Sequence, residues 1–210
     1  MPEKIVLVGG GGHCKVVISV LKESGNFEIV GISDLKGNLE KEILGIPVKF
    51  TDDDLPFLFK EGVKNALVTI GSVGNPEKRV KLFEYLKSIG FKLPVVISKH
   101  AIVKENVTIE EGTIVMPGAI INPGTKIGKN VIINTGSIIE HDCVIGDHVH
   151  VAPGAVLSGG VIVDSETHIG AGAVIIQNIR IGKKTIIGAG AVVVRDIPDM
   201  VVAKGVPARY

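Results

Sequence analysis

Histidine side chains gather in one short part of this sequence. Four of its six histidines lie within 28 residues: His141, His148, His150 and His168. A neutral imidazole can take up a proton near neutral pH, and it is also a common metal ligand. A carboxylate that accepts a hydrogen bond from an imidazole N–H raises the basicity of the ring, and Asp142 follows His141 directly. These residues predict His141 as a general base, with Asp142, or alternatively Glu140, as its partner.

A six-residue repeat carries these histidines. From Ile97 to Val193 every sixth residue is Ile, Val or Leu, without a break in register. The fourth place of each unit is mostly Gly or Asn, which tolerate the positive φ of a tight corner. The pattern predicts a parallel β-helix in which three units of six complete one coil of about eighteen residues. One large inward residue per unit cannot bury itself alone, so neighbouring coils must stack.

The repeat sets the neighbours of His141. Moving eighteen positions along the chain in either direction reaches Pro123 and Gly159, each about 4.8 Å from His141 across the stacked coils. Gly159 has no side chain, which leaves open space beside the imidazole. A base that faces a substrate needs such an opening.

The same rule sorts the other three histidines. His150 and His168 are eighteen positions apart and should stack on successive coils. Such a pair suits either a metal site or hydrogen bonds to a ligand lying along the helix. Ile132 takes the next position of that column, so a metal site would need a ligand from a neighbouring subunit. His148 stacks on Glu166, which we interpret as a surface pair.

The first 96 residues show another pattern, in which short apolar runs alternate with amphipathic segments. We expect strands at residues 4–8, 28–32 and 65–70. One helix is expected to end near Gly25, a second to have its N-cap at residues 52–54, and a third to begin near Asn75, after the last of these strands. This alternation predicts a parallel sheet with helical crossovers. The expected fold is a Rossmann-like α/β domain followed by the β-helix and a tail, at residues 1–96, 97–198 and 199–210.

A run of four glycines, Gly9 to Gly12, separates the first expected strand from the first helix. Glycines at such a junction let backbone N–H groups and the helix N-terminus approach a phosphate. The dinucleotide fingerprint needs a further Gly where Cys14 stands, so we favour a mononucleotide or nucleotide-sugar over NAD, with a ligand-free packing turn as the alternative. Ligands of such sheets bind at the carboxyl ends of the strands. The candidate contacts there are Gly11, Gly12, His13, Ser33, Asp34 and Gly71.

Composition excludes several classes of function. A net charge of +1 argues against a general nucleic-acid binder, which needs a basic stripe. The two cysteines, Cys14 and Cys143, are far apart and suggest a reducing compartment, with Cys143 as a buried filler of the repeat. No apolar run reaches the roughly 18 residues of a membrane span. The first residues lead directly into a strand, so we expect no secretory signal and a cytoplasmic location.

Several motifs resemble one family. The repeat together with the motif GVPAR resembles the hexapeptide acyltransferases. The order of VGGGGH, TIGSVGN, NTGSIIEHDCVIGDHVHVAPGAVLSGGV and KGVPAR is similar to that of the NeuD/PglD-like acetyltransferases of sialic-acid and bacillosamine pathways. The resemblance implies a left-handed β-helix and a homotrimer with active sites between adjacent helices. It also implies acetyl-CoA as donor, no metal, and a sugar acceptor held partly by the N-terminal domain.

Position by position, the resemblance assigns a role to each candidate residue. His141 resembles the catalytic base, and Asp142 the acidic residue that enhances it. The donor contacts implied are His150 at the acetyl group and Gly159 and Ala171 along the CoA channel. The nucleotide-sugar contacts implied are Gly11, Gly12, His13, Asp34 and Gly71. Two features differ from the family: Asp142 stands where Glu is common, and the loop IGSVGN is longer than the usual IGNN.

The function expected from these observations is acetyl transfer from acetyl-CoA to an amino or hydroxyl group of a sugar, which we expect to be nucleotide-linked. Two other classes of protein are compatible with the same repeat and histidines. A zinc enzyme of the γ-carbonic-anhydrase kind would hold metal with histidines across subunits. A non-catalytic scaffold would bind the nucleotide-sugar without any affinity for acetyl-CoA.

Overall fold

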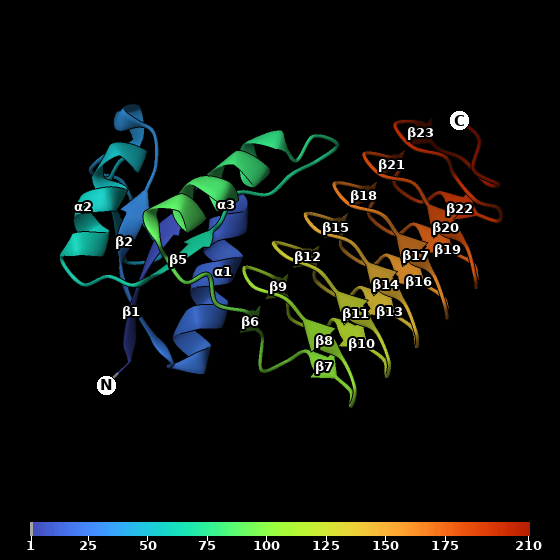
Figure 1. Ribbon diagram of the computed structural model, residues 1–210, viewed down its shortest axis with the longest axis horizontal. Coiled ribbons are helices and arrows are strands. Elements are labelled where there is room, and N and C mark those ends of the chain that lie inside the picture. Colours follow the sequence, from blue (N-terminus) through green and yellow to red (C-terminus); the bar gives the residue numbers. More distant parts are fainter. Residues whose placement is uncertain (1) are drawn as a thin grey trace.

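In the computed structural model, which describes residues 2–210, an α/β unit is followed by a long stack of short strands (Figure 1). The α/β unit contains one five-stranded sheet in the order β3-β4-β2-β1-β5. Its strands are β1 (Glu3–Val8), β2 (Phe27–Ser33), β3 (Glu42–Ile43), β4 (Ile46–Phe50) and β5 (Asn65–Val68). Its helices are α1 (Gly12–Ser24), α2 (Leu55–Lys60) and α3 (Glu77–Ile89), with 3₁₀ turns at Lys36–Asn38 and Asp52–Asp54.

Strand β1, which pairs with β2 and β5, is covered on both faces because both are apolar. Ile5 and Leu7 pack with α1 on one side of the sheet. Val6 and Val8 pack with α2 and α3 on the other. A strand covered on both faces is typical of a parallel sheet with helical crossovers. The α/β prediction is therefore confirmed, and the three expected strands lie within two residues of their predicted ends.

The short strands of the second unit form three parallel sheets, which are the faces of a triangular prism. The first, which we call the covered face, contains β6 (Val96–Ile97), β9 (Ile114–Val115), β12 (Ile132–Ile133), β15 (His150–Val151), β18 (His168–Ile169), β21 (Ile186–Ile187) and β23 (Val202–Ala203). The second, the aliphatic face, contains β7 (Ile102–Val103), β10 (Ile120–Ile121), β13 (Ile138–Ile139), β16 (Val156–Leu157), β19 (Val174–Ile175) and β22 (Val192–Val193). The third, the mixed face, contains β8 (Thr108–Ile109), β11 (Lys126–Ile127), β14 (Val144–Ile145), β17 (Ile162–Val163) and β20 (Arg180–Ile181).

The register of the prism follows the six-residue repeat. The repeated aliphatic residues point inward and form one buried cluster, with small residues such as Ala155 and Cys143 beside them. From Asn106 to Gly190, every residue in the fourth place has a positive φ, including the non-glycine residues Asp142 and His148. Successive coils pair at a spacing of eighteen residues, as in His150 with His168. The predicted coil, corners and inward residues are confirmed.

The two units pack directly against each other. Val96, Ile114 and Met116 at the start of the prism share a core with residues of α1. Helix α3 leans on the corner between the mixed and covered faces, where its Phe83 ring contacts His148 at 5.5 Å between ring centroids. The α/β unit therefore holds a fixed position over the covered face. Among residues 2–210, no helix is long and apolar enough to cross a bilayer.

Candidate active site

His141 and Asp142 form a hydrogen-bonded pair at the corner between the aliphatic and mixed faces. His141 Nδ1 lies 2.8 Å from Asp142 Oδ2, and the two side chains are 63% and 73% exposed. The positive φ of Asp142, 59°, turns the corner so that both adjacent side chains leave on the same side. Because an ionised carboxylate can only accept, Nδ1 carries the hydrogen and Nε2 keeps a lone pair for a substrate proton. An imidazole held in this way can accept a proton at Nε2.

Two glycines on neighbouring coils make room for this pair. A Cβ atom placed on Gly159 would lie 2.6 Å from both Cε1 and Nε2 of His141. A Cβ atom on Gly124 would lie 2.5 Å from Asp142 Oδ1. Real carbon contacts are near 3.5–4.0 Å, so any other residue at these positions would displace the pair. The predicted opening beside His141 is present, and the imidazole lies in it.

A separate groove of about 580 Å³ lies on the covered face, at its border with the aliphatic face. His150 and Ala171, two of the predicted donor contacts, line it. The other lining residues are Val73, Gly74, Asn134, Ala152, Pro153, His168, Gly170, Ile186, Ile187, Gly188 and Ala189. Most of these side chains are small or aliphatic. The groove therefore suits a long and largely uncharged ligand segment.

His150 is buried and neutral. Its Nδ1–H donates to the carbonyl of Ser72 at 2.5 Å, and its Nε2 accepts from the Asn134 amide at 3.0 Å. The side chain is 7% exposed, and burial lowers its pKa to about 3. Both ring nitrogens are thus engaged, which leaves no lone pair for a metal ion. Among residues 2–210, no three His, Cys, Asp or Glu side chains gather into a metal-binding group.

His168 stacks against His150 as predicted, with 5.0 Å between the ring centroids. Burial, and then the charge of Arg79, lower its pKa, and its Nδ1 has no hydrogen-bond partner. The interpretation of His148 as a surface pair with Glu166 is wrong. Its ring is half-buried against Phe83, and its Nδ1 lies 3.0 Å from the Asn130 amide. The eighteen-residue spacing predicts Glu166 as the neighbour of His148 on the next coil, but it gives no sign that α3 covers this histidine.

The four glycines after β1 divide into two pairs. Gly9 has a φ of 105° and packs against Ile70, and Gly10 donates its N–H to Asp34 Oδ2 at 2.8 Å. Gly11 and Gly12 have no atom within 4 Å of an added Cβ. Gly11 is the N-cap of α1, and no side chain caps that helix end. Gly9 and Gly10 are therefore structural, while the two predicted contacts, Gly11 and Gly12, leave a bare helix N-terminus open to an anion.

The remaining predicted contacts lie along the same sheet edge. His13, in the first turn of α1, lies beside Gly71 in the loop that follows β5. Burial and the nearby charge of Arg79 lower the pKa of His13 to about 4, and its Nε2 has no hydrogen-bond partner. Asp34 follows β2 and accepts hydrogen bonds from the Gly10 and Leu35 N–H groups. Ser33 is buried and donates to Asp52, so it does not face this edge.

On one chain the predicted residues thus form three groups. His141, Asp142 and Gly159 lie at one corner of the prism, and His150 and Ala171 lie in the groove across the aliphatic face from them. Gly11, Gly12, His13, Asp34 and Gly71 line the carboxyl edge of the sheet. The loop after β5 connects the last two groups, because Gly71 lies beside His13 while the Ser72 carbonyl bonds to His150.

Two residues at this junction were not predicted. Arg79 is buried at the start of α3, and Asn134 holds His150 in its tautomer. Arg79 lies three and four positions before the buried Leu82 and Phe83, so its place on the inner face of α3 was a usable signal.

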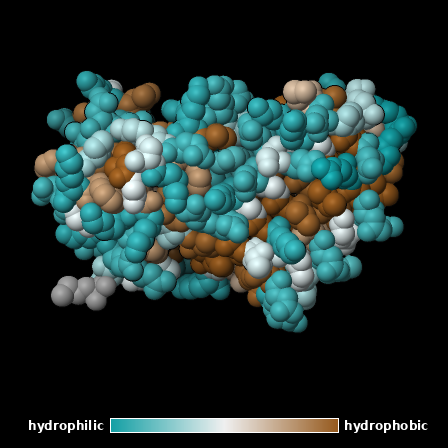
Figure 2. All heavy atoms as spheres, viewed as in Figure 1, coloured by the Kyte–Doolittle hydropathy of each residue, from teal (hydrophilic) through white to brown (hydrophobic). Residues whose placement is uncertain are grey.

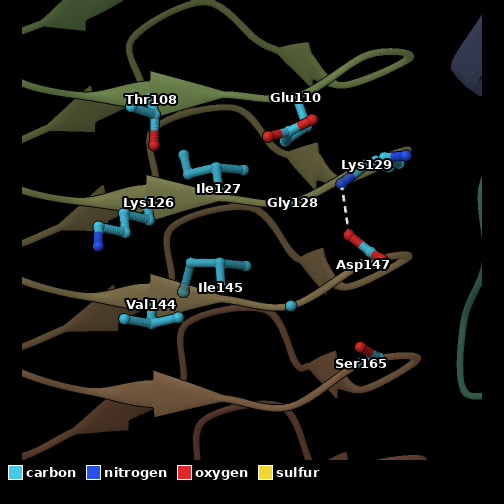
Figure 3. A pocket seen from close by; sticks show the side chains of 11 residues that line it. Thr108, Glu110, Lys126, Ile127, Gly128, Lys129, Val144, Ile145, Asp147 and Ser165 are labelled. Atoms are coloured by element: carbon cyan, nitrogen blue, oxygen red, sulfur yellow. Dashed lines mark hydrogen bonds between the residues drawn. The ribbon is translucent and has the colours of Figure 1, made fainter.

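Another groove, also of about 580 Å³, runs along the mixed face (Figure 3). It contains none of the predicted site residues. Its charged side chains carry both signs, with Glu110 and Asp147 beside Lys126 and Lys129, and the backbone N–H of Lys129 donates to Asp147 Oδ1 at 2.8 Å. The Lys129 ammonium lies 3.6 Å from Glu111, which is not a lining residue of this groove.

Two protein-family models match separate parts of this chain, one in the α/β unit and one in the prism. Residues 4–86 match the PglD N-terminal domain, and residues 124–159 match the bacterial transferase hexapeptide (six repeats). PerB from Caulobacter crescentus, solved in complex with CoA and GDP-perosamine, is 42% identical with a TM-score of 0.91, over 98% of this chain and 96% of that chain. This chain belongs to the PglD-like sugar acetyltransferases.

Other members of this family are similar over their full length. The acetyltransferase domain of PglB from Neisseria gonorrhoeae, in complex with acetyl coenzyme A, is 34% identical with a TM-score of 0.87, over 100% of this chain and 99% of that chain. WeeI from Acinetobacter baumannii is 31% identical with a TM-score of 0.85, over 99% of each chain. The predicted family, its left-handed β-helix and its enzyme class are confirmed for this PglD-like sugar acetyltransferase.

Proposed function

We propose that the protein transfers the acetyl group of acetyl-CoA to an amino group of a nucleotide-linked sugar, with His141 as general base and Asp142 as the carboxylate that orients it. The observation that carries this proposal is the imidazole seated over Gly159, with Nδ1 bound to Asp142 at 2.8 Å. The ligands of the relatives support the substrate classes, since PerB was solved with CoA and GDP-perosamine and the PglB domain with acetyl coenzyme A.

The reaction needs one proton transfer at His141. The sugar nitrogen attacks the thioester carbonyl, and His141 Nε2 takes a proton from that nitrogen as the new C–N bond forms. Asp142 stabilises the imidazolium through the Nδ1–H hydrogen bond. The C–S bond then breaks, the acetyl group stays on the sugar nitrogen, and the thiolate of CoA leaves and receives the proton.

The aliphatic face supports a homotrimer in which two chains share each site. Figure 2 shows a band of hydrophobic residues running along the prism. The outward residues of this face are all branched aliphatics, and Ile102 and Val174 are 48% and 36% exposed. The complete set is Ile102, Ile120, Ile138, Val156, Val174 and Val192. Burying such a stripe against other copies removes apolar surface from water.

The proposed base and the proposed donor groove lie on opposite borders of the aliphatic face, so a site that contains both needs two chains. His141 and Gly159 lie on one border, and Ala171 and Ala189, on the rim of the groove, lie on the other. In a rotational ring, opposite borders of adjacent copies meet. The base of one chain would then approach the donor groove of the next, which brings together groups that are apart on one chain. Acetyl-CoA would lie in this crevice, along His150 and Ala171 of one chain and Gly159 of the other.

The sugar-nucleotide would bind at the carboxyl edge of the α/β sheet. The open amides of Gly11 and Gly12 at the α1 N-terminus suit a diphosphate. Asp34 and the unpartnered Nε2 of His13 are polar groups beside it, and Gly71 leaves space for the ligand. This edge faces the groove through the loop that follows β5, so acceptor and donor would meet at the junction of the two units.

The experiment is a turnover assay with acetyl-CoA and a panel of GDP- and UDP-linked amino sugars, following release of free thiol. His141→Ala should fold and assemble like the wild type but lose roughly 10²–10⁴ in kcat, the share of a general base. His100→Ala is the matched control, because His100 is also an exposed corner histidine beside a carboxylate, at 3.5 Å from Glu23. Near-normal turnover by His141→Ala would remove that residue from the mechanism. Nucleotide-sugar binding without thiol release by the wild type would favour the scaffold alternative.

A further inference from the structure

The loop between β5 and α3, residues Gly71–Asn75, contacts both ligand sites proposed above. At one end Gly71 lies beside His13 at the acceptor edge. In its middle, the Ser72 carbonyl accepts the Nδ1–H of His150. Val73 and Gly74 form part of the wall of the apolar groove. This loop is also the part of the sequence, GSVGN, that is longer than its counterpart in the family motif.

Arg79 anchors this loop from the first turn of α3. Its guanidinium is 1% exposed, and no carboxylate among residues 2–210 forms an ion pair with it. Its Nε donates to Ser72 Oγ at 3.3 Å, one terminal nitrogen donates to the Asn130 carbonyl, and the other donates to the His148 carbonyl at 2.5 Å. Burial lowers the pKa of Arg79 to about 10, so the group stays cationic at neutral pH.

The two carbonyls that bind Arg79 are special positions of the prism. Asn130 and His148 occupy the same corner on successive coils, eighteen residues apart. The hydrogen bonds between coils at this corner run to the preceding residue, as from His148 N–H to the Lys129 carbonyl. The corner carbonyls themselves are therefore free to accept from the guanidinium. Because these carbonyls belong to the fixed backbone of the prism, the buried Arg79 guanidinium keeps its hydrogen bonds in only one position.

Val73 is the member of the loop that points away from this anchor. It is 87% exposed, the largest exposed fraction among the exposed large hydrophobic residues of the chain that the structure describes. The rest of the groove beside it is apolar, with Ala152, Pro153 and Ile186 among its lining residues. An aliphatic side chain standing free at the lip of an apolar groove is covered when a ligand fills that groove, which removes it from water.

We propose that Arg79 is a positioning residue that locks the loop Gly71–Asn75 onto two coils of the prism, so that Val73 forms a wall of the donor groove against the pantetheine arm of acetyl-CoA. The inference rests on the proposed function, because it takes the groove as the donor site. Arg79 touches neither ligand and acts through Ser72 and the loop. The acceptor edge and the donor groove would thus share one rigid segment.

The test is calorimetric titration of the full-length protein with CoA. Val73→Ser should weaken CoA binding about tenfold, the order expected for losing one aliphatic contact. Arg79→Met, which keeps the side-chain volume but removes the hydrogen-bond donors, should weaken CoA binding at least as much. Arg79→Lys should have a CoA affinity between those of the wild type and Arg79→Met, because one ammonium cannot span both carbonyls. Leu44→Ser is the matched control, since Leu44 is 52% exposed in the turn between β3 and β4 and does not line the groove. It should bind CoA like the wild type.

The double variant Val73→Ser/Arg79→Met separates positioning from general destabilisation. If Arg79 acts through the loop, the double variant binds CoA no more weakly than Arg79→Met alone. In turnover assays both single changes should raise KM for acetyl-CoA and leave kcat near normal, because His141 is on another corner. Unchanged CoA affinity in Val73→Ser, or additive losses in the double variant, would overturn the proposal while leaving the proposed function standing.

The test remains decisive even where a variant does not fold or the wild-type protein does not bind CoA. If Arg79→Met does not fold, Arg79→Lys and its double variant with Val73→Ser take its place in the cycle. A wild-type protein that does not bind CoA would contradict the proposed function and this inference together. His141→Ala distinguishes the two ideas further, since it should retain full CoA affinity while it loses turnover.

Discussion

Replacing Gly159 with Ala tests whether the position of the His141 imidazole, the proposed general base, matters for turnover, and it leaves the imidazole itself unchanged. The added Cβ would lie 2.6 Å from Cε1 and Nε2 of His141, where ordinary carbon contacts begin near 3.4 Å. The ring must therefore move by about 1 Å to restore van der Waals distance. His141 is 63% exposed, so its side chain can swing outward with little resistance from neighbours. Gly159 does not have a left-handed φ, so the backbone tolerates Ala at this position.

A displacement of this size should lower the catalytic rate strongly and change the free energy of unfolding little. A misplacement of about 1 Å in a reacting group lowers the rate by roughly 100-fold. The change adds one methyl group at a half-buried position, so the free energy of unfolding should stay within about 0.5 kcal/mol of the wild type. Activity and stability are thus predicted to separate, which is the signature of a positional effect.

The assay is kcat with saturating acetyl-CoA and acceptor, together with a urea unfolding curve on the same sample. Gly37→Ala is the control, because Gly37 also has an ordinary φ and nothing within 4 Å of the added Cβ. It should leave both quantities unchanged. Wild-type kcat in Gly159→Ala would refute the claim that the imidazole works from its seat over this glycine.

Two further predictions concern single side chains. Asp142→Asn should lower kcat about tenfold, because an amide orients the imidazole less strongly than a carboxylate in an exposed pair; a variant with wild-type kcat would show that the pair has no role in turnover. Acid should destabilise the fold through His150, whose pKa is about 3 in the folded protein and 6.5 in the unfolded chain. Between those values only the unfolded chain binds the proton, so as the pH falls below 6.5 the free energy of unfolding drops by about 1.4 kcal/mol per pH unit. His150→Asn should reduce that slope in urea titrations from pH 7 to pH 5, and an unchanged slope would contradict the burial of a neutral ring.

The prism could be predicted from the sequence because its determinants are local and repeated. An inward aliphatic and a corner residue recur every six positions, so one unit predicts the backbone of the next. This held even where the corner residue is not Gly or Asn, as at Asp142 and His148. The hairpin of β3 and β4 was missed, because its two short strands, Glu42–Ile43 and Ile46–Phe50, have no continuous apolar run to mark them.

The residues of the candidate site also differ in how far the sequence alone predicts them. His141, Gly159 and the His150–His168 stack follow from counting residues along the coil. The cover over His148 and the anchor at Arg79 do not, because they depend on how α3 docks on a corner that is more than fifty residues later in the chain. Gly9 and Gly10 look like Gly11 and Gly12 in the sequence. Only the positions of Ile70 and Asp34 show which pair is structural and which is open.

The central claim is that one chain supplies the base and the next supplies the donor groove. Mixing two inactive variants tests it most directly: His141→Ala, which keeps the groove, and Ala171→Trp, which fills the groove but keeps the base. After unfolding and joint refolding, random trimers should contain sites with His141 from one chain and an open groove from its neighbour, and activity should return to about a quarter of the wild-type value. Confirmed mixed trimers without any return of activity would show that each site belongs to a single chain, and would contradict the account.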